Sequence, residues 1–248
     1  MILQSNSLEM AQALGASANS FLRVSDSAYS ECSEGIANLD RIIVSVSSSL
    51  APVARGFFLP ILYAYWERFF KIVFSEYLRC IEQISVELPT VHPKLAKLRL
   101  KRELNEALNK HSIKQVQDIA TTLSIEKAKL FFEDIVSIFG QPVSFIDPTS
   151  WVDTESNVNY QVLEKNCENV GVEINLIKKR LSESEVTLFT ALNDLVGARN
   201  QISHGELFKE IKNEEWEIMK NYVLAIMNAV QLELFETLKD GRCLKKQH

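Results

Sequence analysis

The stretch FFLPILYAYWERFFKIVFSEYLRCI, residues 57–81, predicts a helix at the centre of the fold. Its apolar side chains lie round most of the helix circumference instead of forming one stripe, and they include Phe58, Leu62, Tyr65, Phe69 and Ile72. A helix that is apolar on most sides must be covered by other elements. We expect this helix to begin around Pro60 and to end before Pro89 and Pro93.

The composition favours an all-α fold. Eight glycines and six prolines are few for 248 residues, and the alternation of β-branched with polar residues that marks strands is largely missing. Hydrophobic residues make up 46% and charged residues 24%, which is ordinary for a globular protein. The length is enough for one large domain.

Further helices are expected on both sides of the central one. Apolar residues at spacings of three and four predict a helix from about Ser25 to Pro52 and a last helix around residues 216–234. Residues 1–22 carry a single charge and are expected to form a loosely docked or flexible N-terminal segment. Residues 23–248 are then one helical domain.

Residues 89–172 are expected to be a helical insertion within that domain. One or two helices are predicted in residues 112–139. The stretch GQPVSFIDPTSWVDTESN, residues 140–157, collects turn-forming residues into the longest predicted loop, and a short helix is expected over residues 158–169.

Charge and cysteine usage limit the possible functions. A net charge of −5 argues against broad binding of nucleic acid but allows a local basic site. Lys94, Lys97 and Lys101 share one helical face, which is either an ordinary solvated face or a contact surface for RNA. The four cysteines lie far apart with no CxxC pair, so we expect neither a disulfide framework nor a bound metal or other cofactor.

The location expected from the sequence is the cytoplasm. The N-terminus lacks the features of a secretory signal, and the longest uncharged apolar run, residues 56–66, is too short to cross a bilayer. No association with a membrane is therefore predicted.

The helix predicted after Ser182 carries the residues of functional interest. Ser182 and Glu185 predict a capping box at its start. One stripe then consists of Leu188, Leu192, Leu195, Arg199 and Ile202. Arg199 therefore occupies a core-like position, and because a buried unpaired guanidinium is costly, it should meet a carboxylate or face a cleft.

A neighbouring stripe of this helix is polar or small, and it comprises Asn193, Gly197, Asn200 and His204. Gly197 inside a helix suggests close approach of another backbone. Arg199 and His204 are about 140° apart round a regular helix, so one copy brings them together poorly. Two copies meeting along this stripe, with Asn193 and Gly197 at the contact, would let both pairs converge.

These residue types suit cleavage of RNA without a metal. A histidine transfers the proton of the ribose 2′-hydroxyl, an arginine neutralises charge on the phosphate, and an asparagine orients either one. The sequence contains no HExxH, GxxxxGKS, GxSxG or GxGxxG pattern. The structural alternative is that Arg199 belongs to an internal ion pair and that His204 caps a helix.

The stretch RNQISHG, residues 199–205, resembles the RNxxxH motif of the HEPN superfamily. LYAYWERFFK, residues 62–71, and WVDTESNVNYQVLEKN, residues 151–166, resemble one bacterial branch of it. The resemblance implies an HEPN-type helical bundle, with additional helices inserted between the central helix and the motif helix. It also implies a homodimeric, metal-independent endoribonuclease in which Arg199, His204 and Asn200 form the active site.

Proteins with this motif resemble toxins of toxin–antitoxin pairs or effectors of antiviral defence, which an inhibitory partner protein holds inactive. Glu67, in YWERF, is the best candidate for a supporting polar residue, or it neutralises Arg199. Two other functions remain open. One is a catalytically silent module that binds a nucleotide, RNA or protein, and the other is a structural subunit of a defence complex.

Overall fold

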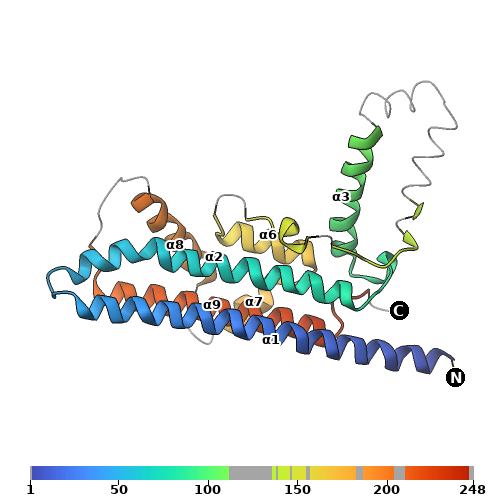
Figure 1. The fold of residues 1–248 in the computed structure, drawn as a ribbon, viewed down its shortest axis with the longest axis horizontal. Helices are drawn as coiled ribbons and strands as arrows, with labels where there is room; N and C mark the ends of the chain where they lie inside the picture. Colours follow the sequence, from blue (N-terminus) through green and yellow to red (C-terminus); the bar gives the residue numbers. More distant parts are fainter. Residues whose placement is uncertain are drawn as a thin grey trace.

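The computed structural model describes the backbone of residues 2–111, 136–137, 139–145, 147–154, 157–182, 187–203 and 210–245. Every regular element in these ranges is an α-helix or a short 3₁₀-helix, and none is a strand (Figure 1). The prediction of an all-α fold is confirmed.

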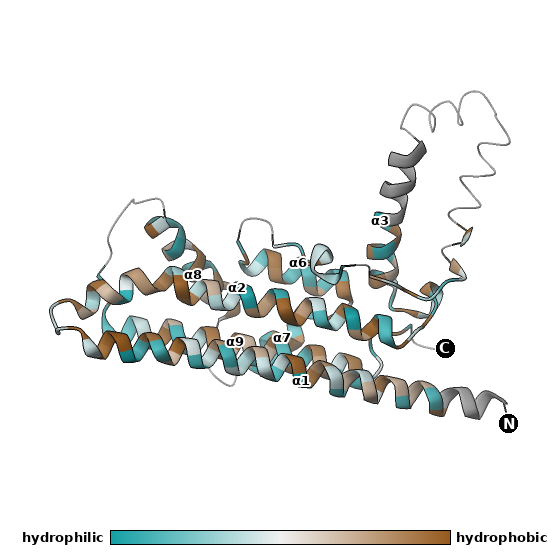
Figure 2. Ribbon diagram, in the orientation of Figure 1, coloured by the Kyte–Doolittle hydropathy of each residue, from teal (hydrophilic) through white to brown (hydrophobic). Residues whose placement is uncertain are grey.

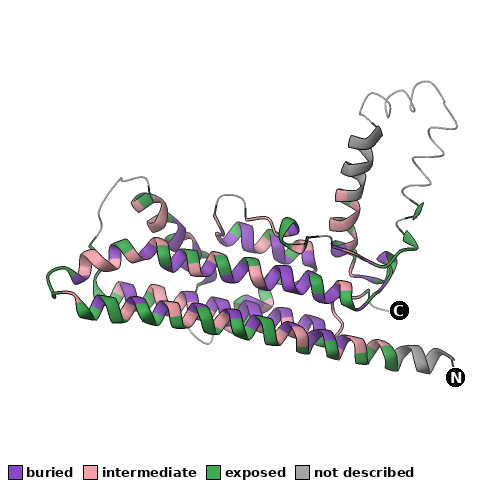
Figure 3. Ribbon diagram, in the orientation of Figure 1, coloured by how far each residue is buried: buried purple, intermediate pink, exposed green. Residues whose placement is uncertain are grey.

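Three long helices form the body of the molecule. They are α1 (Ile2–Ser45), α2 (Ala51–Gln83) and α9 (Asn213–Lys239), and each contacts the other two. Figure 1 shows them running side by side along the long axis. Hydrophobic residues recur along all three (Figure 2), and the buried ones concentrate where these helices face one another (Figure 3).

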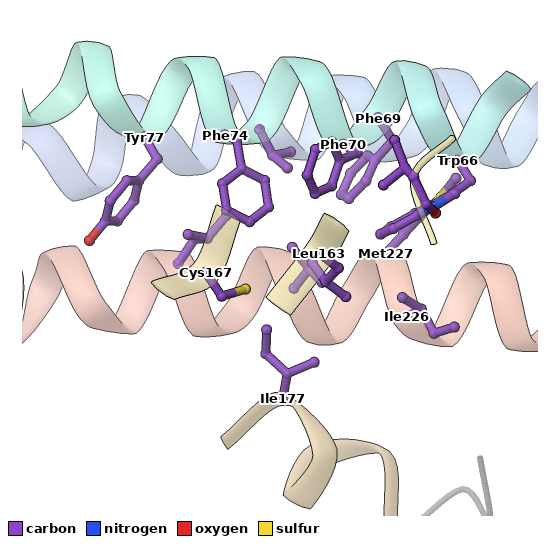
Figure 4. Packing of buried hydrophobic residues seen from close by; sticks show 14 of the residues in the cluster. Trp66, Phe69, Phe70, Phe74, Tyr77, Leu163, Cys167, Ile177, Ile226 and Met227 are labelled. Atoms are coloured by element: carbon purple, nitrogen blue, oxygen red, sulfur yellow. The ribbon is translucent and has the colours of Figure 1, made fainter. Parts of the chain in front are cut away.

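Helix α2 supplies the centre of the core, as its sequence predicts. Its largest fully buried side chains are Tyr63, Trp66, Phe69, Phe70, Phe74 and Tyr77. Figure 4 shows several of them between α2 and α9, opposite Ile226 and Met227 of α9. The remaining side of this core is closed by Leu163 and Cys167 of α6 (Tyr160–Val170) and by Ile177 of α7 (Ile174–Ser182).

The expected start of α2 at Pro60 is wrong. The helix begins at Ala51, with Pro52 in its first turn, where a missing backbone N–H costs nothing, and Pro60 lies inside it. An internal proline removes one hydrogen bond of the helix. Leu59 and Leu62 on either side of it are fully buried, so tertiary packing keeps the helix continuous across Pro60.

From Leu14 onward, the N-terminal segment that we expected to be loosely docked or flexible packs on the domain. Helix α1 runs without interruption from Ile2 to Ser45. Ser17 Oγ donates a hydrogen bond to the carbonyl oxygen of Cys80 at 2.6 Å, and the buried ring of Phe21 packs edge-on against Tyr77. Leu14, Ala18 and Phe21 form a short apolar stripe that docks this part of α1 on α2.

The region between α2 and α8 contains η1 (Leu88–Thr90), α3 (Pro93–His111), η2 (Pro148–Trp151), α6 and α7. The helices expected in residues 112–139 fall almost entirely outside the described residues. The long predicted loop contains η2. Helix α6 begins two residues later than expected because Asn159 caps it, accepting a hydrogen bond from the backbone N–H of Val162 at 3.0 Å.

Helix α8 (Leu188–Ser203) carries the first part of the predicted motif and contacts α2, α6 and α9. Leu188, Leu192 and Leu195 are buried, which confirms the apolar stripe. The predicted start of this helix at Ser182 is wrong, because Ser182 is the last residue of α7 and α8 begins at Leu188. The side chains of Ser182 and Glu185 lie outside the described residues. The cysteines, Cys32, Cys80, Cys167 and Cys243, are buried and free of disulfides. None of the helices, so far as they are described, is long and apolar enough to span a membrane.

Candidate functional site

Arg199 lies in the last turn of α8 and is held by neutral groups. Its Nη1 donates to Asn200 Oδ1 at 2.9 Å and to Asn157 Oδ1 at 3.2 Å. Its guanidinium carbon lies 5.3 Å from the centre of the Tyr63 ring, a cation–π contact. Among the described residues Arg199 has no carboxylate partner, and Nε and Nη2 have no acceptor. Within the described part of the chain, its positive charge is therefore positioned without being neutralised.

Two residues of α2, Tyr63 and Trp66, hold the segment that carries Asn157. The backbone N–H of Val158 donates to the Tyr63 hydroxyl at 2.8 Å, and Trp66 Nε1 donates to the Val158 carbonyl oxygen at 2.9 Å. All three residues are buried. Both backbone polar groups of Val158 are thus bonded to helix α2, which places the neighbouring Asn157 beside Arg199.

A second asparagine fixes the other end of the same stretch. The side chain of Asn166 on α6 is buried and bonds the backbone of Asp153 in both directions. Asn166 Oδ1 accepts from the Asp153 N–H at 3.2 Å, and Nδ2 donates to the Asp153 carbonyl oxygen at 2.6 Å. Asp153 is therefore bonded to α6, as Val158 is bonded to α2.

The Tyr63 hydroxyl stays protonated over the whole neutral range. Burial, with a smaller contribution from the nearby Glu67 carboxylate, raises the pKa of Tyr63 to about 12, although the Val158 N–H and Arg199 act in the opposite direction. A neutral phenol oxygen accepts the Val158 hydrogen bond without competing with a phosphate for Arg199.

Glu67 was expected either to support the site or to neutralise Arg199. In the structure its carboxylate forms an ion pair with Lys71 at 2.6 Å, one turn along α2. The Glu67 carboxylate also contributes to the raised pKa of Tyr63. Among the described residues, the acceptors of Arg199 are the amides of Asn157 and Asn200, and Glu67 is not one of them.

The polar stripe of α8 faces outward in the single chain. Asn193 and Asn200 are half-buried, and Gly197 is exposed. A Cβ on Gly197 would meet no described atom within 4 Å beyond its own helix, so the described part of the protomer does not make the close approach predicted for this glycine. The structure therefore places Asn200 with Arg199, whereas His204 lies outside the described residues.

The three lysines of α3 do not line one common surface. Lys94 lies 3.7 Å from the Glu168 carboxylate on α6. Lys97 and Lys101 instead line a groove beside α6. The groove lies toward the far end of α6 from Asn157, so these lysines are not part of the Arg199 site.

Three contributors to the site were not recognised as such from the sequence: Asn157, Tyr63 and Trp66. The sequence indicates only that Tyr63 and Trp66 are aromatic residues of the core, and both are indeed buried. Their polar atoms also form the hydrogen bonds that hold Val158. The available signal was the resemblance itself, because it covered residues 62–71 and 151–166, and these two stretches meet at Val158.

An all-α bundle that holds an arginine between two amide oxygens in the last turn of an RNxxxH-type helix has the features of an HEPN domain. The family model of RiboL-PSP-HEPN matches residues 27–235, and the chain belongs to this HEPN family. HEPN families are generally related to ribonuclease and RNA functions. No curated protein and no solved structure matched the chain.

Proposed function

We propose that this protein is a metal-independent endoribonuclease whose active site is shared by two copies of the chain. The observation that supports this most directly is the setting of Arg199. Two amide oxygens and an aromatic ring orient the guanidinium, and no described carboxylate cancels its charge. A guanidinium held in this way binds a phosphate with little loss of side-chain entropy.

In the proposed reaction the nucleophile comes from the RNA. One His204 imidazole takes the proton of the ribose 2′-hydroxyl, and the 2′-oxygen attacks the adjacent phosphorus. The bond from phosphorus to the 5′-oxygen breaks, and that oxygen takes a proton from the protonated His204 of the second copy. The products are a 2′,3′-cyclic phosphate and a 5′-hydroxyl, with no net gain or loss of protons.

Arg199 stabilises the negative charge that builds on the non-bridging phosphate oxygens during this attack. Asn200 and Asn157 act as positioning residues, because their amide oxygens hold Nη1 of Arg199 and leave Nε and Nη2 directed to the substrate. Tyr63 and Trp66 position Asn157 through Val158.

The accessibility of the described part of the polar stripe on α8 supports the two-copy arrangement. Gly197 has open space beside it and Asn193 is half-buried. A second α8 packed against this stripe would bring the two copies of the motif to a common groove, as a two-fold symmetric contact requires.

The biological role proposed is that of a toxin or anti-phage effector, restrained by an inhibitory partner protein. Induced expression in a bacterial host tests the activity and the role together. The wild-type protein should arrest growth, and His204→Ala, expressed at the same level, should not. Equal growth of both strains would instead favour a catalytically silent binding module or a structural subunit.

A further inference from the structure

A groove of about 640 Å³ lies between α3 and the segment from η2 to α6. Four cationic side chains line it, those of Lys97, Lys101, Arg102 and Lys165, together with one carboxylate, that of Asp153. Asp153 is paired with Lys165 at 2.7 Å. A groove with this excess of positive charge is notable on a protein whose net charge is −5.

Arg102, one of the residues that line the groove, is held in position by two neighbours. The guanidinium of Arg102 lies 4.3 Å from the centre of the Trp151 ring, and its Nη1 donates to Ser150 Oγ at 2.9 Å. Trp151 is itself buried and packs edge-on against Phe145, at 5.2 Å between ring centres. A flat guanidinium oriented by an aromatic face suits the recognition of phosphate oxygens.

The two lysines add charge that the described part of the chain does not balance. Lys97 and Lys101 are exposed, one helical turn apart on α3, and neither forms an ion pair with a described residue. Like charges at this spacing destabilise a helix by a few tenths of a kcal/mol. A bound polyanion would relieve that repulsion.

The groove and the Arg199 site are connected by α6. Asn157 precedes the start of α6, whereas Lys165 and Asn169 near its other end line the groove. Helix α6 contacts both α8 and α3, and Figure 1 shows α8, α6 and α3 in succession on the side of α2 opposite to α1. Eleven helical residues span about 16 Å, so one strand of RNA can reach both places.

We propose that this groove binds the phosphate backbone of the RNA substrate at a distance from the cleaved bond. The inference rests on the proposed function, since it identifies the polyanion as RNA from the position of the groove along α6. An acidic protein would fit the charge equally well but would not require the connection to Arg199.

The test uses a single-stranded RNA with 2′-O-methyl groups throughout, which cannot be cleaved by attack of a 2′-hydroxyl. Its affinity for the full-length protein is measured by fluorescence anisotropy over a range of salt concentrations. The groove variant is Lys97→Gln/Lys101→Gln. The matched control is Arg23→Gln/Arg41→Gln, which removes two exposed charges from α1. Thermal melting checks that both variants are folded.

Each lost phosphate contact should lower the slope of log Kd against log salt by about 0.7 for a single strand, so the groove variant should lose about 1.4. The control should keep the wild-type slope. Equal slopes for the wild type and the groove variant would overturn the proposal. So would an equal loss in both variants, or a wild-type protein that does not bind this RNA.

Cleavage of unmodified RNA separates this proposal from the one on which it rests. The groove variant should show a raised KM on a long RNA, with kcat close to that of the wild type, because the groove does not touch the reacting atoms. A protein that binds RNA through the groove but cleaves none would contradict the ribonuclease activity alone. A protein that cleaves through Arg199, with the groove variant binding as the wild type does, would contradict the groove alone.

Discussion

Arg199 Nη1 donates a hydrogen bond to Asn157 Oδ1 at 3.2 Å, across 42 positions of sequence. Asn157 in turn is placed by Val158, whose backbone is bonded to Tyr63 and Trp66. The motif helix, the central helix and the segment before α6 therefore meet at one arginine. Among the described residues, its acceptors are neutral amides and not the carboxylate of an internal ion pair.

Replacing the amide of Asn157 tests whether neutrality matters. Asn157→Asp places a carboxylate against the guanidinium, which should keep Arg199 in position while cancelling its charge. We expect Asn157→Asp to lower kcat/KM about 100-fold and Asn157→Ala about tenfold, since one donor to the transition state is worth roughly 10²–10³. An aspartate variant that cleaves RNA as fast as the wild type would show that the charge of Arg199 is not used.

Tyr63→Phe removes the acceptor of the Val158 N–H and keeps the ring beside Arg199. Leaving a buried donor unsatisfied costs about 1–3 kcal/mol of unfolding free energy. Cleavage should also fall, because Asn157 loses its anchor. Tyr65→Phe is the matched control, since the described residues include no hydrogen-bond partner for the Tyr65 hydroxyl. Urea unfolding and single-turnover cleavage measure the two effects, and equal behaviour of the two variants would count against the anchoring role.

Much of the fold was predictable because it depends on local patterns. The apolar circumference of residues 57–81 marks α2 as central, and the spacing of Leu188, Leu192 and Leu195 marks the buried face of α8. The continuity of α2 through Pro60 was not predictable, because burial of Leu59 and Leu62 overrides the local preference. The docking of α1 before residue 23 was missed because its stripe is short and surrounded by small residues.

The candidate site was predictable only in part, because one of its contacts joins residues that are far apart in the sequence. Arg199 and Asn200 stand in a local motif, and their hydrogen bond joins neighbours in sequence. The contact of Arg199 with Asn157 is non-local, and no periodicity relates the two. Their meeting depends on Val158 being bonded to α2, which is a property of the folded chain.

High pH should destabilise the protein partly through Tyr63. Its pKa is about 12 in the folded state, against 10.0 for an ordinary tyrosine, chiefly because of burial. Below pH 10 both states keep the proton, so this contribution to stability is fully present. This contribution is lost as the pH rises from about 10 through 12, because the tyrosine of the unfolded chain ionises first. The stability advantage of the wild type over Tyr63→Phe should shrink by about 1.4 kcal/mol between pH 9 and pH 11. A constant advantage in urea unfolding would contradict the assignment.

Gly197→Leu tests the shared site. A Cβ there meets no described atom within 4 Å, so the protomer should fold, with up to about 1 kcal/mol gained from helix propensity. In the proposed dimer the side chain would push the two α8 helices apart, so dimerisation and cleavage should be lost together. Gly15→Leu on α1, also with open space beside it, is the control. Sedimentation and RNA cleavage report the outcome, and a monomeric variant with wild-type activity would contradict the shared site.

The end groups left on cleaved RNA test the central claim most directly. Purified wild-type protein is incubated with single-stranded RNA in EDTA beside Arg199→Ala and His204→Ala, and the fragments are weighed by mass spectrometry. The account predicts fragments with a 2′,3′-cyclic phosphate and a 5′-hydroxyl from the wild type, and at least about 100-fold less cleavage from each variant. Both variants should melt close to the wild type, since loss of Arg199 strands no described carboxylate. Cleavage that needs added magnesium and leaves 5′-phosphates, or variants as active as the wild type, would contradict it.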